Sequence, residues 1–481
     1  MNTSVQPWGG RARRSAAAQH ASSYLLVVPA DERARLARGW LWLGIAALIG
    51  SGLFSILLVL SRTPGLNRML PVADFFHVAL VVHVDLSVLV WFVALAGLLW
   101  SASGSARGLR AGWAALALCS VGATAIALAP FTGGGTAVMA NYIPMLTSPV
   151  FIGGLLVFGA GAGVLVTRTM LTALPVGRAF DGAGALRFGL NAAAVSGAVA
   201  LLAFGASWIE APRSLDARAY YEIVYWGGGH ALQFTWTLLM LVAWLWLASA
   251  CGARLPLSPR VTVLMFSLAL ASVFVTPYAY LAHDIASVEH RRLLTWAMRL
   301  GGGVSILPIG LAVVFGLHAR RSSDDAARPL RAALLASLAL FGAGGLIGVF
   351  IQGSDVRIPA HYHGCIVGVT LALMGLVHHM LPRLGYRAPR GRLAVMQPWL
   401  YGGGQLMHIA GLVWSGGYGV QRKVAGAEQV LRTPGEVAGM ALMGAGGAVA
   451  IVGGLLFVVV VLRAMGWPLA RATLGRRAGA R

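Results

Sequence analysis

Twelve long apolar stretches follow one another along this chain, and short polar linkers separate them. Each stretch is close to the about 20 residues that an α-helix needs to cross the hydrocarbon core of a bilayer. The pattern therefore predicts an all-α, polytopic membrane bundle of about 12 transmembrane helices. The expected spans are residues 39–61, 74–100, 112–131, 147–171, 188–209, 222–249, 260–283, 293–318, 331–352, 360–382, 397–419 and 436–462.

Because the linkers are short, the spans are expected to form one membrane domain over residues 39–463. An N-terminal arm, residues 1–38, would precede it, and a basic tail, residues 464–481, would follow it. Most of the 37 Lys and Arg residues fall in linkers that would lie on the same side as the arm and the tail. Positive charge concentrates on the cytoplasmic side of membrane proteins, so both termini are expected in the cytoplasm.

The composition excludes two other classes of protein. Of the 481 residues, 58% are hydrophobic and only 11% are charged, whereas soluble domains carry about 25% charged residues. The net charge of +22 would suit a nucleic-acid partner, but the arginines flank apolar spans instead of gathering on one face. We therefore expect a lipid bilayer around the chain and no nucleic acid.

The most informative polar residues begin the span at 360–382, where the sequence reads His361-Tyr362-His363. Each helical residue turns by about 100°, so the two imidazoles differ by about 200° and leave opposite faces of one helix. A helix that offers a histidine to each side suits two metal centres placed next to each other. Polar groups inside membrane spans are functional candidates by default.

Other histidines are expected near the same side of the membrane. His83 and His230 lie in the outer part of spans that run inward. His283 and His290 flank the outer junction of spans seven and eight. Imidazole is the commonest protein ligand for haem iron and copper. Together with the pair at the start of 360–382, these residues predict a group of metal centres in the outer half of the membrane.

With these motifs in view, the chain resembles subunit I of the haem-copper oxidase superfamily over nearly its whole length. Within that superfamily it looks most like the bacterial C-type, or cb-type, cytochrome c oxidase subunit I. The resemblance implies the haem-copper oxidase subunit I fold, two haems (b being the expected type), a copper ion and a place in the bacterial inner membrane. The nitric oxide reductase large subunit shares this architecture and is the nearest relative.

The resemblance also implies roles for individual residues around the haems. His361 would be the proximal ligand of the high-spin haem that binds oxygen. His363 and His83 would hold the low-spin haem between them. Arg422 and Lys423, in the outer loop between spans eleven and twelve, would hold the haem propionates.

The copper ligands depart from the family pattern. The resemblance assigns copper to His230 and His290, and the family usually has a second histidine directly after the latter. Here that residue is Arg291, which stays protonated and has no lone pair to offer a metal. His283 would be a replacement ligand if the chain bends between it and His290.

The redox-active tyrosine and the proton supply are less clear from the sequence. The commonest oxidases carry a tyrosine four residues after the span-six histidine, where this chain has Phe234. C-type enzymes take it from span seven, which here offers Tyr278 and Tyr280. Asp85 is the main acid within a span, and no proton path follows from it. Proton translocation is therefore left open.

The implied function is the catalytic subunit of a respiratory terminal oxidase. Electrons would pass through the low-spin haem to the high-spin haem and copper, where O2 is reduced to water. The three cysteines lie far apart and form no CxxCH or CxxC motif. Cytochrome c, or a subunit with a c-type haem or copper, would therefore supply the electrons, and small accessory membrane subunits are expected beside the chain.

Two alternatives stay open. A nitric oxide reductase would hold a non-haem iron in place of copper, with Glu289 or Glu222 helping the histidines. A non-enzymatic haem membrane protein or a transporter would also have twelve spans, although transporter sites usually lie at the midplane. The haem and metal content of the purified protein would separate these alternatives.

Overall fold

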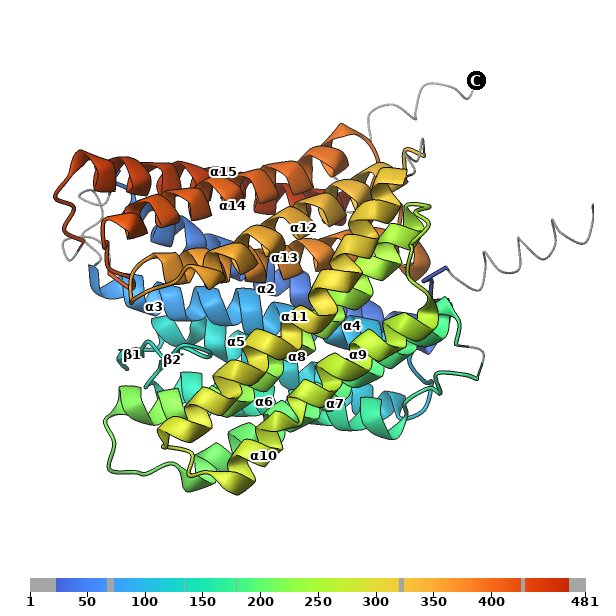
Figure 1. Cartoon of the computed structure of the whole chain (residues 1–481), viewed down its shortest axis with the longest axis horizontal. Coiled ribbons are helices and arrows are strands. Elements are labelled where there is room, and N and C mark those ends of the chain that lie inside the picture. Colours follow the sequence, from blue (N-terminus) through green and yellow to red (C-terminus); the bar gives the residue numbers. More distant parts are fainter. Residues whose placement is uncertain are drawn as a thin grey trace, which may run out of the picture.

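The computed structural model describes residues 23–66, 73–133, 135–178, 180–319, 324–424 and 429–466. Residues 1–22 of the expected arm and 467–481 of the expected tail lie outside the described residues. The described chain is a bundle of long helices with one short antiparallel hairpin (Figure 1), which confirms the all-α class. The α-helices are α2 (Glu32–Arg62), α3 (Ala73–Val84), α4 (Trp91–Ser103), α5 (Leu109–Leu128), α6 (Pro149–Leu171), α7 (Gly182–Glu210), α8 (Ala217–Ala250), α9 (Pro259–Val273), α10 (Val275–Ala282), α11 (Val288–Ala319), α12 (Ala327–Val349), α13 (Arg357–Met380), α14 (Arg392–Gly417) and α15 (Pro434–Ala464). The shorter elements are the π-helix η2 (Asp85–Val90), the 3-10 helices η3 (Ala129–Phe131) and η4 (Leu381–Leu384), and the strands β1 (Ala137–Val138) and β2 (Met145–Leu146).

Eleven helical segments in the described part of the chain are long and apolar enough to cross a membrane. The expected span at 397–419 corresponds to α14, which has 26 residues but is interrupted by polar side chains such as Gln397, Gln405 and His408. Figure 1 shows α14 running alongside α15 within the bundle. The chain is therefore a multi-pass membrane protein, and α14 occupies the place of the remaining expected span.

Polar residues explain where several helices begin. The carboxylates of Asp181 and Asp216 accept backbone N–H groups in the first turns of α7 and α8. Thr433 and Glu436 form a capping box at the start of α15. Each cap satisfies N–H groups that have no partner inside the helix.

The seventh expected span, residues 260–283, is broken into α9 and α10 at Phe274. Pro277 lies in the first turn of α10 and has no backbone N–H, so it cannot continue the hydrogen bonding of α9. A further bend between α10 and α11 separates His283 from His290. The chain therefore has the bend that His283 would need in order to share a metal ion with His290.

Small residues allow α14 and α15 to pack closely. A Cβ atom at Gly404, Gly411 or Gly446 would collide with the backbone of the facing helix. Close approach of this kind is typical of helices in lipid, where packing contacts replace the hydrophobic effect between helices. The glycine content of the chain therefore serves, at these positions, to hold α14 against α15.

The described chain starts and ends at the same end of the bundle, on the right in Figure 1, whereas β1 and β2 lie at the opposite end. We call this opposite end the hairpin end. Among the eleven candidate spans, α8 and α13 are the most enclosed, with 83% and 89% of their central residues buried. These two helices carry His230, His361 and His363, so the candidate ligands belong to the centre of the bundle.

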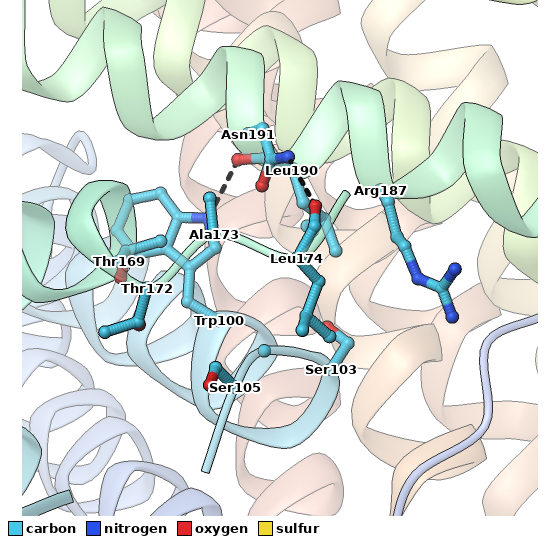
Figure 2. Close-up of a pocket in the computed structure, with 11 residues that line it drawn as sticks. Trp100, Ser103, Ser105, Thr169, Thr172, Ala173, Leu174, Arg187, Leu190 and Asn191 are labelled. Atoms are coloured by element: carbon cyan, nitrogen blue, oxygen red, sulfur yellow. Dashed lines mark hydrogen bonds between the residues drawn. The ribbon is translucent and has the colours of Figure 1, made fainter. Parts of the chain in front are cut away.

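A small hollow lies between α4 and α7 (Figure 2). Trp100 donates its indole N–H to the Leu190 carbonyl at 3.0 Å, and Asn191 donates to the Leu174 carbonyl at 3.2 Å. The hollow between these groups has a volume of about 20 Å³, which holds about one water molecule. It is too small for a cofactor.

Candidate functional site

Asp355 fixes the start of α13, the helix that carries His361 and His363. Its carboxylate accepts the backbone N–H of Arg357 at 2.8 Å and pairs with the guanidinium of Arg357 at 2.6 Å. This pairing holds the pKa of Asp355 below its usual value. A β-bridge between Asp355 and Gln421 ties the same point to the loop after α14. The start of α13 and this loop are therefore held together.

His361 is oriented by the neighbouring helix α12. Its Nδ1 atom lies 2.7 Å from the carbonyl oxygen of Gly344. Because a carbonyl only accepts, Nδ1 donates and Nε2 keeps its lone pair. Backbone contact between α12 and α13 makes this possible, since a Cβ on Gly344 would lie 2.5 Å from the backbone nitrogen of Cys365. A histidine held in this way is prepared to bind a metal through Nε2.

His83 has the same arrangement on another helix. Its Nδ1 atom lies 3.0 Å from the carbonyl oxygen of Ser51 on α2 and 3.0 Å from the Ser51 hydroxyl. The other ring nitrogen, Nε2, has no hydrogen-bond partner in the part of the chain that the structure describes. The π-helix η2 follows directly, from Asp85 to Val90. Such insertions are frequent at functional sites.

His363 lies beside α14. Gln405 lies near its ring, and the ring of His408 lies 4.7 Å away between centroids. His83 is close enough to His363 for their charges to interact. His83 and His363 therefore lie together, whereas His361 faces α12, in keeping with the opposite faces expected of the pair on α13.

His290 lies close enough to His230 for their charges to interact, but the surroundings of the two rings differ. His230 has both ring nitrogens occupied, with Nδ1 at 2.8 Å from the Trp226 carbonyl and Nε2 at 3.1 Å from the Tyr142 hydroxyl. His290 is 1% exposed, and neither of its ring nitrogens has a partner among the described residues. Its ring packs edge-on against Tyr280 at 4.9 Å.

Aromatic rings reach His230 and His290 because glycines make room for them. A Cβ on Gly229 would overlap the ring of Tyr142, and a Cβ on Gly227 would overlap the ring of Tyr280. The hydroxyl of Tyr280 turns away from His290 and lies 2.6 Å from the Ser207 hydroxyl. Tyr280 therefore contacts a candidate ligand through its ring alone.

Three other candidate residues are more exposed at the surface of the protein. Tyr278 is 59% exposed on α10, and Glu289 is exposed on α11. His283 is partly exposed in extended backbone at the end of α10. Within the described ranges, no three His, Cys, Asp or Glu side chains converge so that they could hold a metal ion. The structure thus brings His230 and His290 together without a third ligand.

A polar cavity of about 300 Å³ lies at the hairpin end. Asn141, in the turn between β1 and β2, donates its backbone N–H to Glu222 at 3.1 Å and also hydrogen-bonds this carboxylate through its side chain. Lys423 donates to the Met139 carbonyl at 2.6 Å. Burial, followed by the charge of Arg422, lowers the pKa of Lys423 to about 8. The hairpin, α8 and the loop after α14 therefore meet around this cavity, which is lined by Met139, Asn141, Asp216, Arg218, Ala219, Glu222, Arg291, Arg422 and Lys423.

The family described as Cytochrome C and Quinol oxidase polypeptide I matches residues 35–450. The chain belongs to this family. The match covers most of the sequence, and it confirms the resemblance to haem-copper oxidase subunit I. Membership identifies the chain as a membrane protein of an oxidoreductase family whose members bind haem together with copper or iron.

This oxidase-family chain is similar to two uncharacterized bacterial proteins. It is 29% identical to one from Rickettsia prowazekii (strain Madrid E) over 501 residues, covering 89% of this chain and 96% of that protein. It is 28% identical to one from Aquifex aeolicus (strain VF5), covering 75% and 88%. Its fold matches a haem-copper terminal oxidase solved as a dimer by cryo-EM, with a TM-score of 0.68 and 16% identity over 92% of this chain and 85% of that chain.

His361, His83 and His363 fit haem. His361 offers a single fixed imidazole, and His83 and His363 offer two imidazoles that lie close together. A single axial histidine suits a haem that binds a gas, and two suit a haem that only transfers electrons. Arg422 lies near Tyr362, the residue between the two histidines at the start of α13.

The residues around His230 and His290 do not fit copper. His230 has no lone pair left, because Nδ1 donates to a carbonyl and Nε2 must accept from Tyr142. Glu222 is held by Asn141, and Glu289 is exposed. No mechanistic step is therefore assigned to a second metal.

Two residues near the candidate ligands were not anticipated from the sequence. Tyr142 reaches His230 from a hairpin 88 residues earlier in the chain. His408 reaches His363 from α14. His408 follows Gln405 by three positions, which places both on one helical face, and that spacing was the only signal in the sequence.

Proposed function

We propose that this chain is the catalytic subunit of a respiratory terminal oxidase of the cytochrome c oxidase type in the bacterial inner membrane. The observation that carries the proposal is the hydrogen bonding of His361 and His83. Each donates Nδ1–H to a backbone carbonyl of a neighbouring helix and keeps Nε2 for a metal. His408 makes a bond of the same kind to the Met443 carbonyl, so the proposal also draws on the positions of His361 and His83 in the family pattern.

In this proposal His83 and His363 hold a low-spin haem, and His361 holds a high-spin haem. When bound, these haems, with b as the proposed type, supply electron transfer and an iron that binds O2. Arg422 and Lys423 hold the propionates by charge. Cytochrome c, or a subunit with a c-type haem or copper, delivers electrons at the hairpin end. That end faces the outside, so that both termini are cytoplasmic, and small accessory membrane subunits complete the enzyme.

The chain's own residues handle protons and water near the haem on His361. Tyr142 offers its hydroxyl proton at His230, and Tyr280 covers His290 with its ring. The apolar surroundings of α8 and α13 exclude bulk water, which strengthens each of these interactions. Asp85, buried and next to the low-spin pair, is the nearest acid for proton movement, and any coupling to proton translocation would involve it.

The test is the haem content of the purified protein, measured with its oxygen consumption from reduced cytochrome c. We expect two haems per chain, of which one binds CO, and consumption of O2. Reduction of NO without consumption of O2 would overturn the oxidase assignment in favour of a nitric oxide reductase. Protein that is folded but free of haem would overturn both and leave the transporter alternative.

A further inference from the structure

The charge next to His230 is unusual for a metal site. The guanidinium of Arg291 lies 5.6 Å over the ring of Trp226, and the Trp226 ring lies 4.8 Å from the ring of His230. Stacking on an indole fixes a guanidinium in place without removing its charge. A permanent positive charge is therefore held one ring away from the candidate copper ligand.

The cavity beside this arginine adds to the same effect. Its lining includes four basic side chains, Arg218, Arg291, Arg422 and Lys423, and two acidic ones, Asp216 and Glu222. Four basic and two acidic side chains leave the balance of charge positive. A divalent cation that approached His230 from the hairpin end would meet repulsion.

The donor atoms lead to the same conclusion independently of charge. Copper sites in proteins use several imidazole or sulfur ligands. Here Tyr142 occupies the one lone pair of His230. The ring of His290 lies against Tyr280, and the residue after it is an arginine. One available imidazole does not make a stable copper site.

We propose that the position next to the haem on His361 binds no copper in this chain, and that Arg291 provides a fixed positive charge there in place of a metal ion. Tyr142 completes the position by donating to His230. This inference rests on the proposed function, because it concerns the same site. It separates this chain from haem-copper enzymes while keeping the haem chemistry.

The experiment measures iron and copper in the full-length protein, purified with its haems from cells grown with added copper. We expect about two irons and less than about 0.1 copper per chain in the wild type. About one copper per chain would overturn the proposal. Absence of haem would count against the proposed function, and the copper value would still decide this inference by itself.

Two variants test whether Arg291 is the cause. Arg291→His restores the neighbouring histidine and removes the charge, and combined with Tyr142→Phe it also frees His230. We expect copper to rise at least about fivefold in the double variant, with a Cu(II) EPR signal. Arg292→His is the matched control, since Arg292 is the next residue and is exposed, and it should gain no copper. Equal copper in the control and in the double variant would overturn the role of Arg291.

Discussion

Two groups of histidines occupy the hairpin end, and they differ in their hydrogen bonds more than in depth or helix type. In the first, His361 and His83 each have one nitrogen fixed by a carbonyl, and the other has no hydrogen-bond partner among the residues that the structure describes. In the second, His230 has both nitrogens occupied and His290 has neither. The comparison teaches that the partners of a histidine decide which ring nitrogen keeps a lone pair and could bind a metal.

The largest expected effect is at His361. Alanine at this position removes the only fixed imidazole on its face of α13, so the CO-difference spectrum should disappear while one haem per chain remains. His378→Leu is the control on the same helix, because His378 is 2% exposed and stacks on Phe457 at 5.6 Å. That variant should keep both haems. Normal CO binding in His361→Ala would remove His361 from the first group.

A smaller effect is expected at Gln405, which lies near His363 and is positioned to orient it once haem is bound. Replacement by leucine should lower the affinity for the low-spin haem by about tenfold, the lower limit for loss of a partner of a metal-bound histidine. Haem release to an acceptor protein measures this. The control is Gln397→Leu on the same helix, since Gln397 contacts Met374 and the Gly453 carbonyl instead. Equal haem release in both variants would mean that Gln405 orients nothing.

The pH should affect haem retention through Lys423. With its pKa at about 8, Lys423 is charged below that pH and neutral above it, so it holds a propionate less well as the pH rises. We expect haem release to become about threefold faster as the pH rises above about 8, with a midpoint above the pKa of the haem-free protein because a bound propionate favours the charged lysine. Lys423→Arg should abolish this pH dependence, because arginine stays charged.

The same lowered pKa acts on stability in the opposite direction. The unfolded chain binds the proton of Lys423 more tightly than the folded chain does, so the free energy of unfolding of haem-free protein should rise above pH 8 up to the usual lysine pKa of 10.5. A free energy of unfolding that falls between pH 8 and 10.5 would mean that another group dominates the titration.

The smallest effect is expected at Tyr142. Phenylalanine removes the hydroxyl that pairs with His230, and the free energy of unfolding should fall by about 1 kcal/mol. Unfolding by SDS in mixed micelles measures this difference. Tyr278→Phe is the control, because Tyr278 is exposed and should show no change. Equal losses in the two variants would show that the contact with His230 contributes nothing.

The sequence predicted the architecture well, because the length of each apolar stretch alone selects a membrane helix. Eleven of the expected spans meet that criterion in the described chain, and α14 fills the remaining place although polar residues such as Gln405 interrupt it. The separation of His361 and His363 also followed from the turn per residue.

The partners of the histidines could not be predicted, because they come from distant segments. Tyr142 lies in a hairpin, and the rotation of α14 that brings His408 to His363 depends on its contacts with α13 and α15. The burial of a histidine does not by itself identify it as a metal ligand. His378 and His379 lie at the other end of α13, at 2% and 5% exposure, and nothing in the sequence pattern distinguishes them from ligands.

The contact between Lys423 and Met139 has a consequence for how the protein is made. These residues are separated by 284 positions, and Lys423 follows α14, whereas the hairpin follows α5. During synthesis the hairpin emerges long before its partner exists, so the cover over the polar cavity closes only after α14 has been inserted. The last contact that covers the cavity can thus form only after most of the chain has been synthesised.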